Sequence, residues 1–393
     1  MRNDCEELPL LLSIANIHVD ARKKETSEAF ALTAYLPVPQ FLDVSAQQQS
    51  ILARRVYHRC LDIILADLKD AEDHPRWMLD PHGQLRLVHT PLVAWIADYP
   101  DQWTIAGISP KGSKPIEALS VSKADDVCTA LPSRMRQRTL ELIHAACSMT
   151  DPWNLPAFSK TAGILGLNGV VQPFWRDWGT AEPSSFLVQD TVDLWQKFFY
   201  NHCLEKAVDC VGGPELDRRL SLLQPRLGVR RWEGLTRMLR CIPLCDLETI
   251  LPGVVAGVVP EATLCAVRAT AQVVRLLKAH GPILLKESLH ALPSVRHDRC
   301  YSRRYQGHPF GHCGILCPHA VQHVVFSICA MGSPDQWSTV LTERYCAAYA
   351  KTSSNVSSAR AFGDHRPSYN RCEEMMRALL LRMALKVGGS SPP

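Results

Sequence analysis

The sequence lacks the features that mark membrane and secreted proteins. The apolar stretch 251–259 is far shorter than the roughly 18 residues that a membrane-spanning helix needs, and Pro252 and Pro260 interrupt and bound it. Residues 1–7 carry three acids and one basic residue, whereas a secretory signal begins with positive charge. We therefore expect a soluble protein that keeps its 15 cysteines as free thiols in a reducing compartment.

Motifs of common enzyme classes are missing as well. The sequence contains no glycine loop that would cradle a phosphate, no nucleophile elbow and no HExxH motif. These absences remove the usual support for nucleotide-dependent and serine-hydrolase chemistry.

What is present is the composition of an ordinary globular protein. The chain has 393 residues, of which 46% are hydrophobic and 21% charged, and this length allows two or three domains with their own cores. The net charge of +4 permits binding to nucleic acid without requiring it. Any such binding must therefore come from local clusters of basic residues.

An apolar segment rich in β-branched and aromatic residues, 90–101, is the centre of the predicted fold. Its length and composition predict a buried strand that ends at Asp98. In α/β sheets the carboxyl ends of strands are where ligands and metals collect. Asp98 is therefore a candidate metal ligand, and the alternative is a residue that forms a turn beside Pro100. Further short apolar runs predict strands at 8–17, 29–36 and 85–88.

The rest of the chain has a helical pattern. Apolar residues three or four apart predict a helix over 45–69, and the stretch 109–123 has the prolines and glycine of a linker. After it, helices are expected at 135–147, 190–211, 234–249 and 262–278. We thus expect an α/β sheet domain followed by α-helical regions, with boundaries at 1–108, 109–295 and 296–393.

A segment near the C-terminus is dense in cysteine and histidine. The candidate zinc ligands in it are Cys313, Cys317, His319 and His323. No C-x₂-C pair accompanies them, so the alternative is a polar loop with incidental histidines. The corresponding functional hypothesis is an interaction protein that zinc stabilises.

A second candidate site is a stretch rich in arginine. Between positions 218 and 240 the only acid is Glu233. Guanidinium groups suit bidentate contacts with phosphate, and an aromatic ring among them would stack on a base. The alternative is a solvated helix face that forms ion pairs with the acidic stretch 209–217. The candidate nucleic-acid-binding residues are Arg218, Arg219, Arg226, Arg230, Arg231, Trp232, Arg237 and Arg240.

The middle of the chain resembles a known family. The run LNGV at 167–170, followed by PFWRDW at 173–178 and AEPSSFL at 181–187, is similar to the middle of Plavaka-type transposases, which belong to fungal DNA transposons related to the CACTA group. Shorter similar segments lie at 8–17, 35–39, 96–100, 212–217, 223–226, 251–257, 322–325, 336–338, 342–344 and 371–372.

This resemblance implies a DDE/D transposase, with a ribonuclease-H-like sheet that a large helical insertion interrupts and residues 296–393 complete. Such enzymes cut and rejoin DNA with divalent ions, here Mg²⁺, that three acids hold. By position, Asp98 matches the second acid and Glu343 is the candidate for the third. The implied partner is DNA and the implied location is the nucleus; oligomer formation is left open.

One departure from the family pattern matters for activity. The family's first catalytic aspartate lies on a strand before the one that matches Pro9 onward, and the setting of Asp4, the nearest acid, does not match. We therefore expect a truncated, catalytically inactive remnant with residual DNA binding. The alternative is a non-catalytic protein that binds nucleic acid or is stabilised by zinc.

Overall fold

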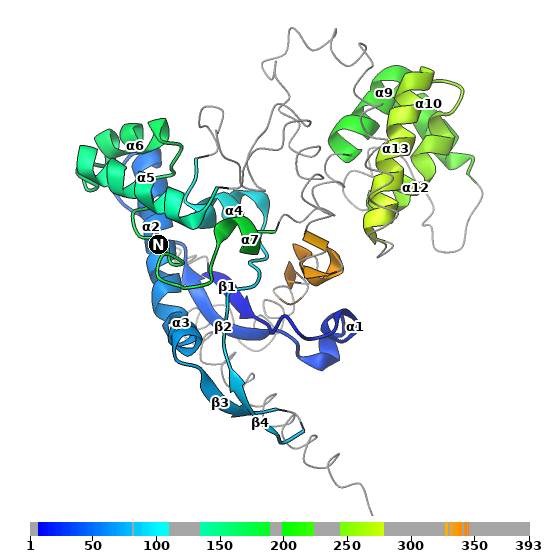
Figure 1. Cartoon of the computed structure of the whole chain (residues 1–393). Helices are drawn as coiled ribbons and strands as arrows, with labels where there is room; N and C mark the ends of the chain where they lie inside the picture. The colour runs from blue at the N-terminus through cyan, green and yellow to red at the C-terminus, as the bar shows by residue number, and fades with distance from the viewer. Residues whose placement is uncertain are drawn as a thin grey trace, which may run out of the picture. The chain divides into compact units, whose positions relative to one another are not determined.

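The structure is a computed structural model, and it describes residues 7–80, 82–109, 134–188, 199–223, 244–278, 327–328, 331–332, 334–339, 342–343 and 345. They form helices and small antiparallel sheets (Figure 1). The chain divides into two compact units, the first comprising 1–122, 130–188 and 339–393 and the second 123–129 and 189–338. The expected domain boundaries after 108 and 295 stay predictions.

Two of the predicted strands form the first sheet. Strand β1 (Glu7–Leu12) pairs with β2 (Ala31–Pro37) in antiparallel orientation, with an irregularity between Leu10 and Leu11. The two strands are joined through helix α1 (Val19–Arg22) and a 3-10 turn, η1 (Glu25–Ser27). The predictions of strands within 8–17 and 29–36 are confirmed.

The helix predicted over 45–69 is two helices. α2 (Ala46–Ile64) begins with a capping box, in which the Ser45 side chain accepts from the Gln48 N–H and the Gln48 side chain accepts from the Ser45 N–H. Leu65 interrupts the helical conformation with φ −96° and ψ 8°, and α3 (Ala66–Asp73) follows it. The apolar face of α2 is buried, with Leu61 fully inaccessible.

The strand predicted at 85–88 is confirmed, and it belongs to a second sheet. β4 (Leu85–Val88) pairs with β3 (Arg76–Leu79) in a separate two-stranded sheet. Asp80 stabilises the turn between them, because its carboxylate accepts from the Gln84 N–H and from Arg86 Nε, at 2.9 and 2.8 Å. β3 and β4 therefore form a hairpin outside the β1–β2 sheet.

The prediction of a strand that ends at Asp98 is wrong. The segment before Asp98 makes only one β-bridge, from Trp95 to Leu187, and the next helix, α4 (Tyr99–Ala106), begins directly after it. Pro91 lacks an N–H for a ladder, and the Trp95 ring packs on Phe174 with ring centroids 5.1 Å apart. Leu92 and Trp95 are thus half-buried by packing against the core rather than by a sheet, and Val93 is exposed.

Helices and a compact loop complete the first unit. Its further helices among the described residues are α5 (Arg136–Met149), α6 (Leu155–Ile164) and α7 (Pro183–Phe186). The main core contains Leu36 of β2, Leu61 of α2 and Ile105 of α4, together with aromatic residues of 174–186. Residues 134–188 therefore pack in the same unit as the N-terminal sheet.

The second unit is helical in its described part. It contains the π-helical turn η2 (Phe199–Leu204), α9 (Glu205–Val211), α10 (Gly213–Ser221), α12 (Leu244–Val255), α13 (Glu261–Lys278) and the 3-10 turn η4 (Pro334–Gln336). Leu216, Leu251 and Val255 are among its fully buried residues. None of the helices in the described ranges has the length and apolar character needed to cross a membrane.

Candidate functional site

Asp98 lies at the N-terminus of α4. Its side chain caps the helix by accepting from the Asp101 N–H at 3.0 Å, and the residue is exposed. Both readings of Asp98 from the sequence fit this geometry, because a helix cap can keep a carboxylate at the surface.

A second carboxylate, Asp101, lies beside Asp98. Burial, followed by the neighbouring negative charge of Asp98, raises the pKa of Asp101 to about 6, against the opposing effect of hydrogen bonds from Tyr57 and Trp95. The Tyr57 hydroxyl donates to Asp101 at 3.2 Å, and burial together with Asp101 raises the tyrosine pKa. The two acids thus differ in environment, since Asp98 is exposed, whereas Asp101 is half-buried and accepts a hydrogen bond from Tyr57.

Glu343, the candidate for the third acid, is also exposed and belongs to the first unit. Nearby Tyr345 packs on Phe30, with ring centroids 4.9 Å apart, and donates to the Lys24 carbonyl at 3.4 Å. In the described part of the chain, no three His, Cys, Asp or Glu side chains are grouped so that they could hold a metal ion. The described residues therefore contain no three-ligand metal site that includes Asp98 or Glu343.

The position of α4 depends on the loop 167–187. Trp175 is fully buried, and its indole Nε1 donates to the Ile105 carbonyl at 2.7 Å. The Asn168 side chain donates to the Trp103 carbonyl at 3.1 Å. The Gln102 side chain of α4 donates to the carbonyl of Val188, the residue after this loop, at 2.8 Å. The run that carries the family resemblance is therefore a scaffold that orients the helix beginning after Asp98.

His58 of α2 connects the same elements. Its Nδ1 accepts from the Phe174 N–H at 3.2 Å, which leaves Nε2 as the donor to the Thr104 carbonyl at 2.9 Å. Burial lowers the pKa of His58 to about 4, against the opposing effects of the Thr104 bond and Asp62, while Arg176 adds to the lowering. The neutral ring is therefore part of the folded structure.

Acidification should destabilise the protein through His58. The contribution of the neutral His58 ring to the free energy of unfolding is present above pH 6.5 and falls as the pH drops toward 4. In that range the ring binds a proton in the unfolded chain but stays neutral in the folded protein. We expect a loss of about 2 kcal/mol of unfolding free energy from this residue between pH 7 and pH 5. Urea unfolding at several pH values measures it. His58→Gln should reduce the dependence of the free energy of unfolding on pH, and His74→Gln, at an exposed position, should not.

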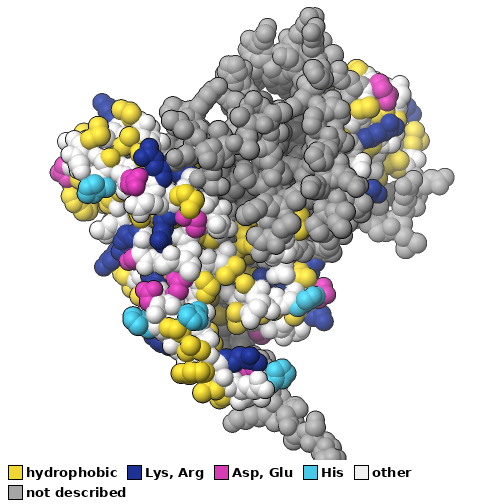
Figure 2. All heavy atoms as spheres, viewed as in Figure 1, with side chains coloured by type: hydrophobic (Ala, Val, Ile, Leu, Met, Phe, Trp, Pro, Cys, Tyr) yellow, Lys and Arg dark blue, Asp and Glu magenta, His cyan; other side chains and the backbone are white. Residues whose placement is uncertain are grey.

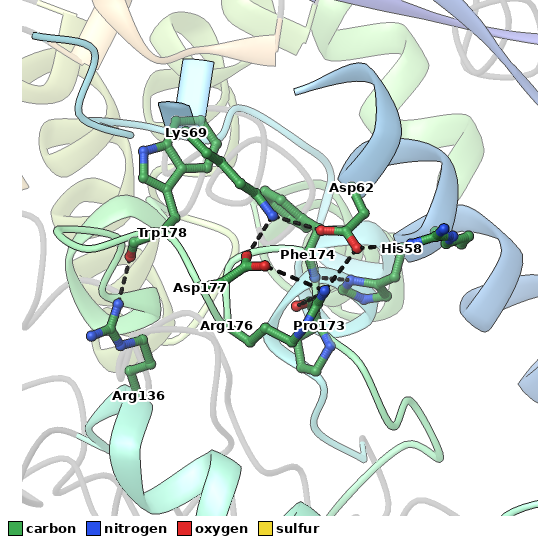
Figure 3. Close-up of polar contacts among 10 residues, drawn as sticks. His58, Asp62, Lys69, Arg136, Pro173, Phe174, Arg176, Asp177 and Trp178 are labelled. Atoms are coloured by element: carbon green, nitrogen blue, oxygen red, sulfur yellow. Dashed lines mark hydrogen bonds and ion pairs between the residues drawn. The ribbon is translucent and has the colours of Figure 1, made fainter. Parts of the chain in front are cut away.

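A network of ion pairs surrounds this region (Figure 3). Asp62 of α2 contacts Lys69 of α3 at 2.6 Å and Arg176 at 2.9 Å, and Lys69 also contacts Asp177 at 2.6 Å. The Asp62 and Lys69 side chains are only 8% and 11% exposed. The network joins the 173–178 run to α2 and α3, so these charges have a structural role.

Two residues of the arginine-rich stretch are visible on α10. Arg218 and Arg219 contact Glu215 at 2.7 and 2.8 Å, and Arg219 also donates to the Val254 carbonyl at 3.1 Å. These are ion pairs with the acidic stretch, the alternative stated above, and nucleic-acid binding by these two residues stays a prediction. Outside the described residues lie Arg226, Arg230, Arg231, Trp232, Arg237, Arg240 and the candidate zinc ligands Cys313, Cys317, His319 and His323.

Sequence reasoning missed His58, Asp62 and Asp101. Asp62 follows His58 by four residues, so both side chains lie on one face of α2, and this spacing was the available signal. Their partners at 174–177 are more than 100 residues away, and no local pattern connects the two segments.

A comparison with known families gives a match over half of the chain. The family model described as Plavaka transposase matches residues 1–205. No curated protein and no solved structure is detectably similar to the chain. The matched range includes the β1–β2 sheet, Asp98 and the loop 167–187, and it confirms the resemblance that those segments carry.

Proposed function

Because this chain belongs to the Plavaka transposase family, we propose that it is a transposase-derived protein that binds DNA without cutting it. The observation that carries the proposal is the match over residues 1–205, which includes Asp98 at an exposed helix N-terminus. The first unit descends, in this proposal, from a ribonuclease-H-like DDE/D core, and helices of the second unit are its insertion. The protein acts in the nucleus, where the DNA that it binds is.

Asp98 and Glu343 are the residues that would hold Mg²⁺ in an active relative of this chain. Both are exposed carboxylates, and carboxylate oxygens are the ligands that Mg²⁺ prefers. A bound ion would stabilise negative charge that develops on the phosphodiester during cleavage. Two-metal chemistry depends on a complete set of three ligands, and in the described residues no three His, Cys, Asp or Glu side chains are grouped to provide one. Metal-dependent cleavage by this chain is therefore expected to be absent.

DNA binding falls, in this proposal, to the arginine-rich stretch. Fluorescence anisotropy with a labelled duplex should show affinity for DNA that falls steeply as salt rises, because bound arginines release counterions from the phosphates. Arg230→Ala with Arg231→Ala should lower the affinity about tenfold or more and reduce the salt slope by about 2. Arg138→Ala with Arg268→Ala removes the same charge from exposed positions and should change the affinity little.

Two results would contradict different parts of the proposal. Binding that is undetectable or insensitive to salt would exclude the DNA-binding part. Nicking of a supercoiled plasmid in Mg²⁺ or Mn²⁺ that disappears in Asp98→Ala would exclude the inactive part and restore a catalytic role for that carboxylate.

A further inference from the structure

The β3–β4 hairpin has one apolar face. Its register places Trp77 opposite Leu87 and Leu79 opposite Leu85. Paired residues lie on the same side of a sheet, and so do residues two apart along a strand. All four side chains therefore share one face, and they are 65%, 47%, 71% and 60% exposed, in the order named. Figure 2 shows hydrophobic side chains gathered over the position of β3.

This face does not stabilise the fold of a single chain. Within the described residues the sheet has only these two strands, and a hairpin of this kind is marginally stable alone in water. Apolar side chains left in water at a hairpin tip contribute little to its folding free energy. A contiguous exposed apolar patch of a few hundred Å² on a protein is typical of an interaction surface.

The charges beside the face are already neutralised within the chain. Arg76 pairs with Asp70 and Arg86 pairs with Asp80, each at 2.8 Å. Both arginines lie on strand positions that alternate with the apolar ones, so they are on the opposite side of the hairpin. The apolar face therefore presents no charged side chain that a partner would have to match or that would repel an identical face.

We propose that this apolar face is a self-association surface, which docks against the same face of a second copy of the chain. A surface without charged side chains is complementary to itself, and a twofold axis brings the same patch of two copies together. The eight side chains of two copies would bury on the order of 1,000 Å² in total, near the lower limit for a specific interface. The dimer should therefore be weak, with a dissociation constant in the micromolar range.

Sedimentation velocity on the full chain tests this proposal, at concentrations from about 1 to 100 µM. The expected result is a concentration-dependent shift from monomer to dimer. Leu79→Thr with Leu85→Thr should raise the dissociation constant at least about tenfold, as should the single variant Leu87→Lys. Threonine keeps a high strand propensity, so the hairpin itself should persist.

The matched control is Met78→Thr, which changes an exposed side chain on the opposite face of β3. It should leave the dissociation constant unchanged. A wild-type chain that stays monomeric at every concentration would overturn the proposal, and so would an equal effect of the control variant. Slow hydrogen exchange over 76–88 in the dilute monomer would also overturn it, because another part of the same chain would then cover the face.

Discussion

Replacing Trp175 with alanine should lower the free energy of unfolding by about 3–5 kcal/mol. The side chain is fully buried among Phe174, Phe186 and Ile105 in the main core of the first unit, so its removal leaves a large cavity. The variant also loses the indole donor to the Ile105 carbonyl, which becomes a buried acceptor without its partner. Urea unfolding followed by circular dichroism measures the change.

Trp153→Ala is the matched control for this prediction, because Trp153 is 76% exposed. It contacts the Arg55 guanidinium, 5.6 Å from the ring centroid, and loss of such a contact at an exposed site costs about 1 kcal/mol or less. If both variants unfold at the same denaturant concentration, the loop 167–187 is not the scaffold of the first unit.

Asp62→Ala should lower the free energy of unfolding by about 3 kcal/mol. It leaves Lys69 and Arg176 near each other with only the half-exposed Asp177 carboxylate as a shared partner, and the Lys69 side chain has little access to water. Burial opposes ionisation of Asp62, but hydrogen bonds from Arg176 and Lys69 outweigh it and lower its pKa. The contribution is therefore present at neutral pH and is lost as the pH falls through the lowered pKa.

Asp177→Ala separates this effect from a general loss of charge. Asp177 contacts the same Lys69, but its side chain is 52% exposed, so water can replace the interaction. A loss of about 1 kcal/mol or less is expected from thermal or urea unfolding. Equal losses for the two aspartates would mean that the burial of Asp62 does not matter. A wild-type-like Asp62→Ala protein would show that the network does not hold the loop to α2.

Local patterns in the sequence were sufficient for several elements. The strands β1 and β2 follow from short apolar runs, and α2 follows from apolar residues three or four apart. The interactions that produce these features involve residues a few positions apart, so the pattern contains most of the information. The family resemblance likewise depended on a continuous run, 167–187, and the match over 1–205 confirms it.

The tertiary structure decided what local patterns leave open. The segment before Asp98 has the composition of a strand, yet Trp95 is satisfied by packing on Phe174 and by a single bridge to Leu187. An apolar side chain gains the same free energy against a sheet or against a loop, so its hydrophobicity does not identify its partner.

The same limit applies to the polar residues around the candidate site. The sequence by itself indicated the family and the helical pattern of 45–69, and it singled out Asp98. Only the tertiary structure showed that Asp98 caps α4, that Tyr57 donates to Asp101, and that His58 joins Phe174 to Thr104. Hydrogen bonds and ion pairs between distant segments depend on chain topology, and neither residue type nor spacing along the chain specifies it.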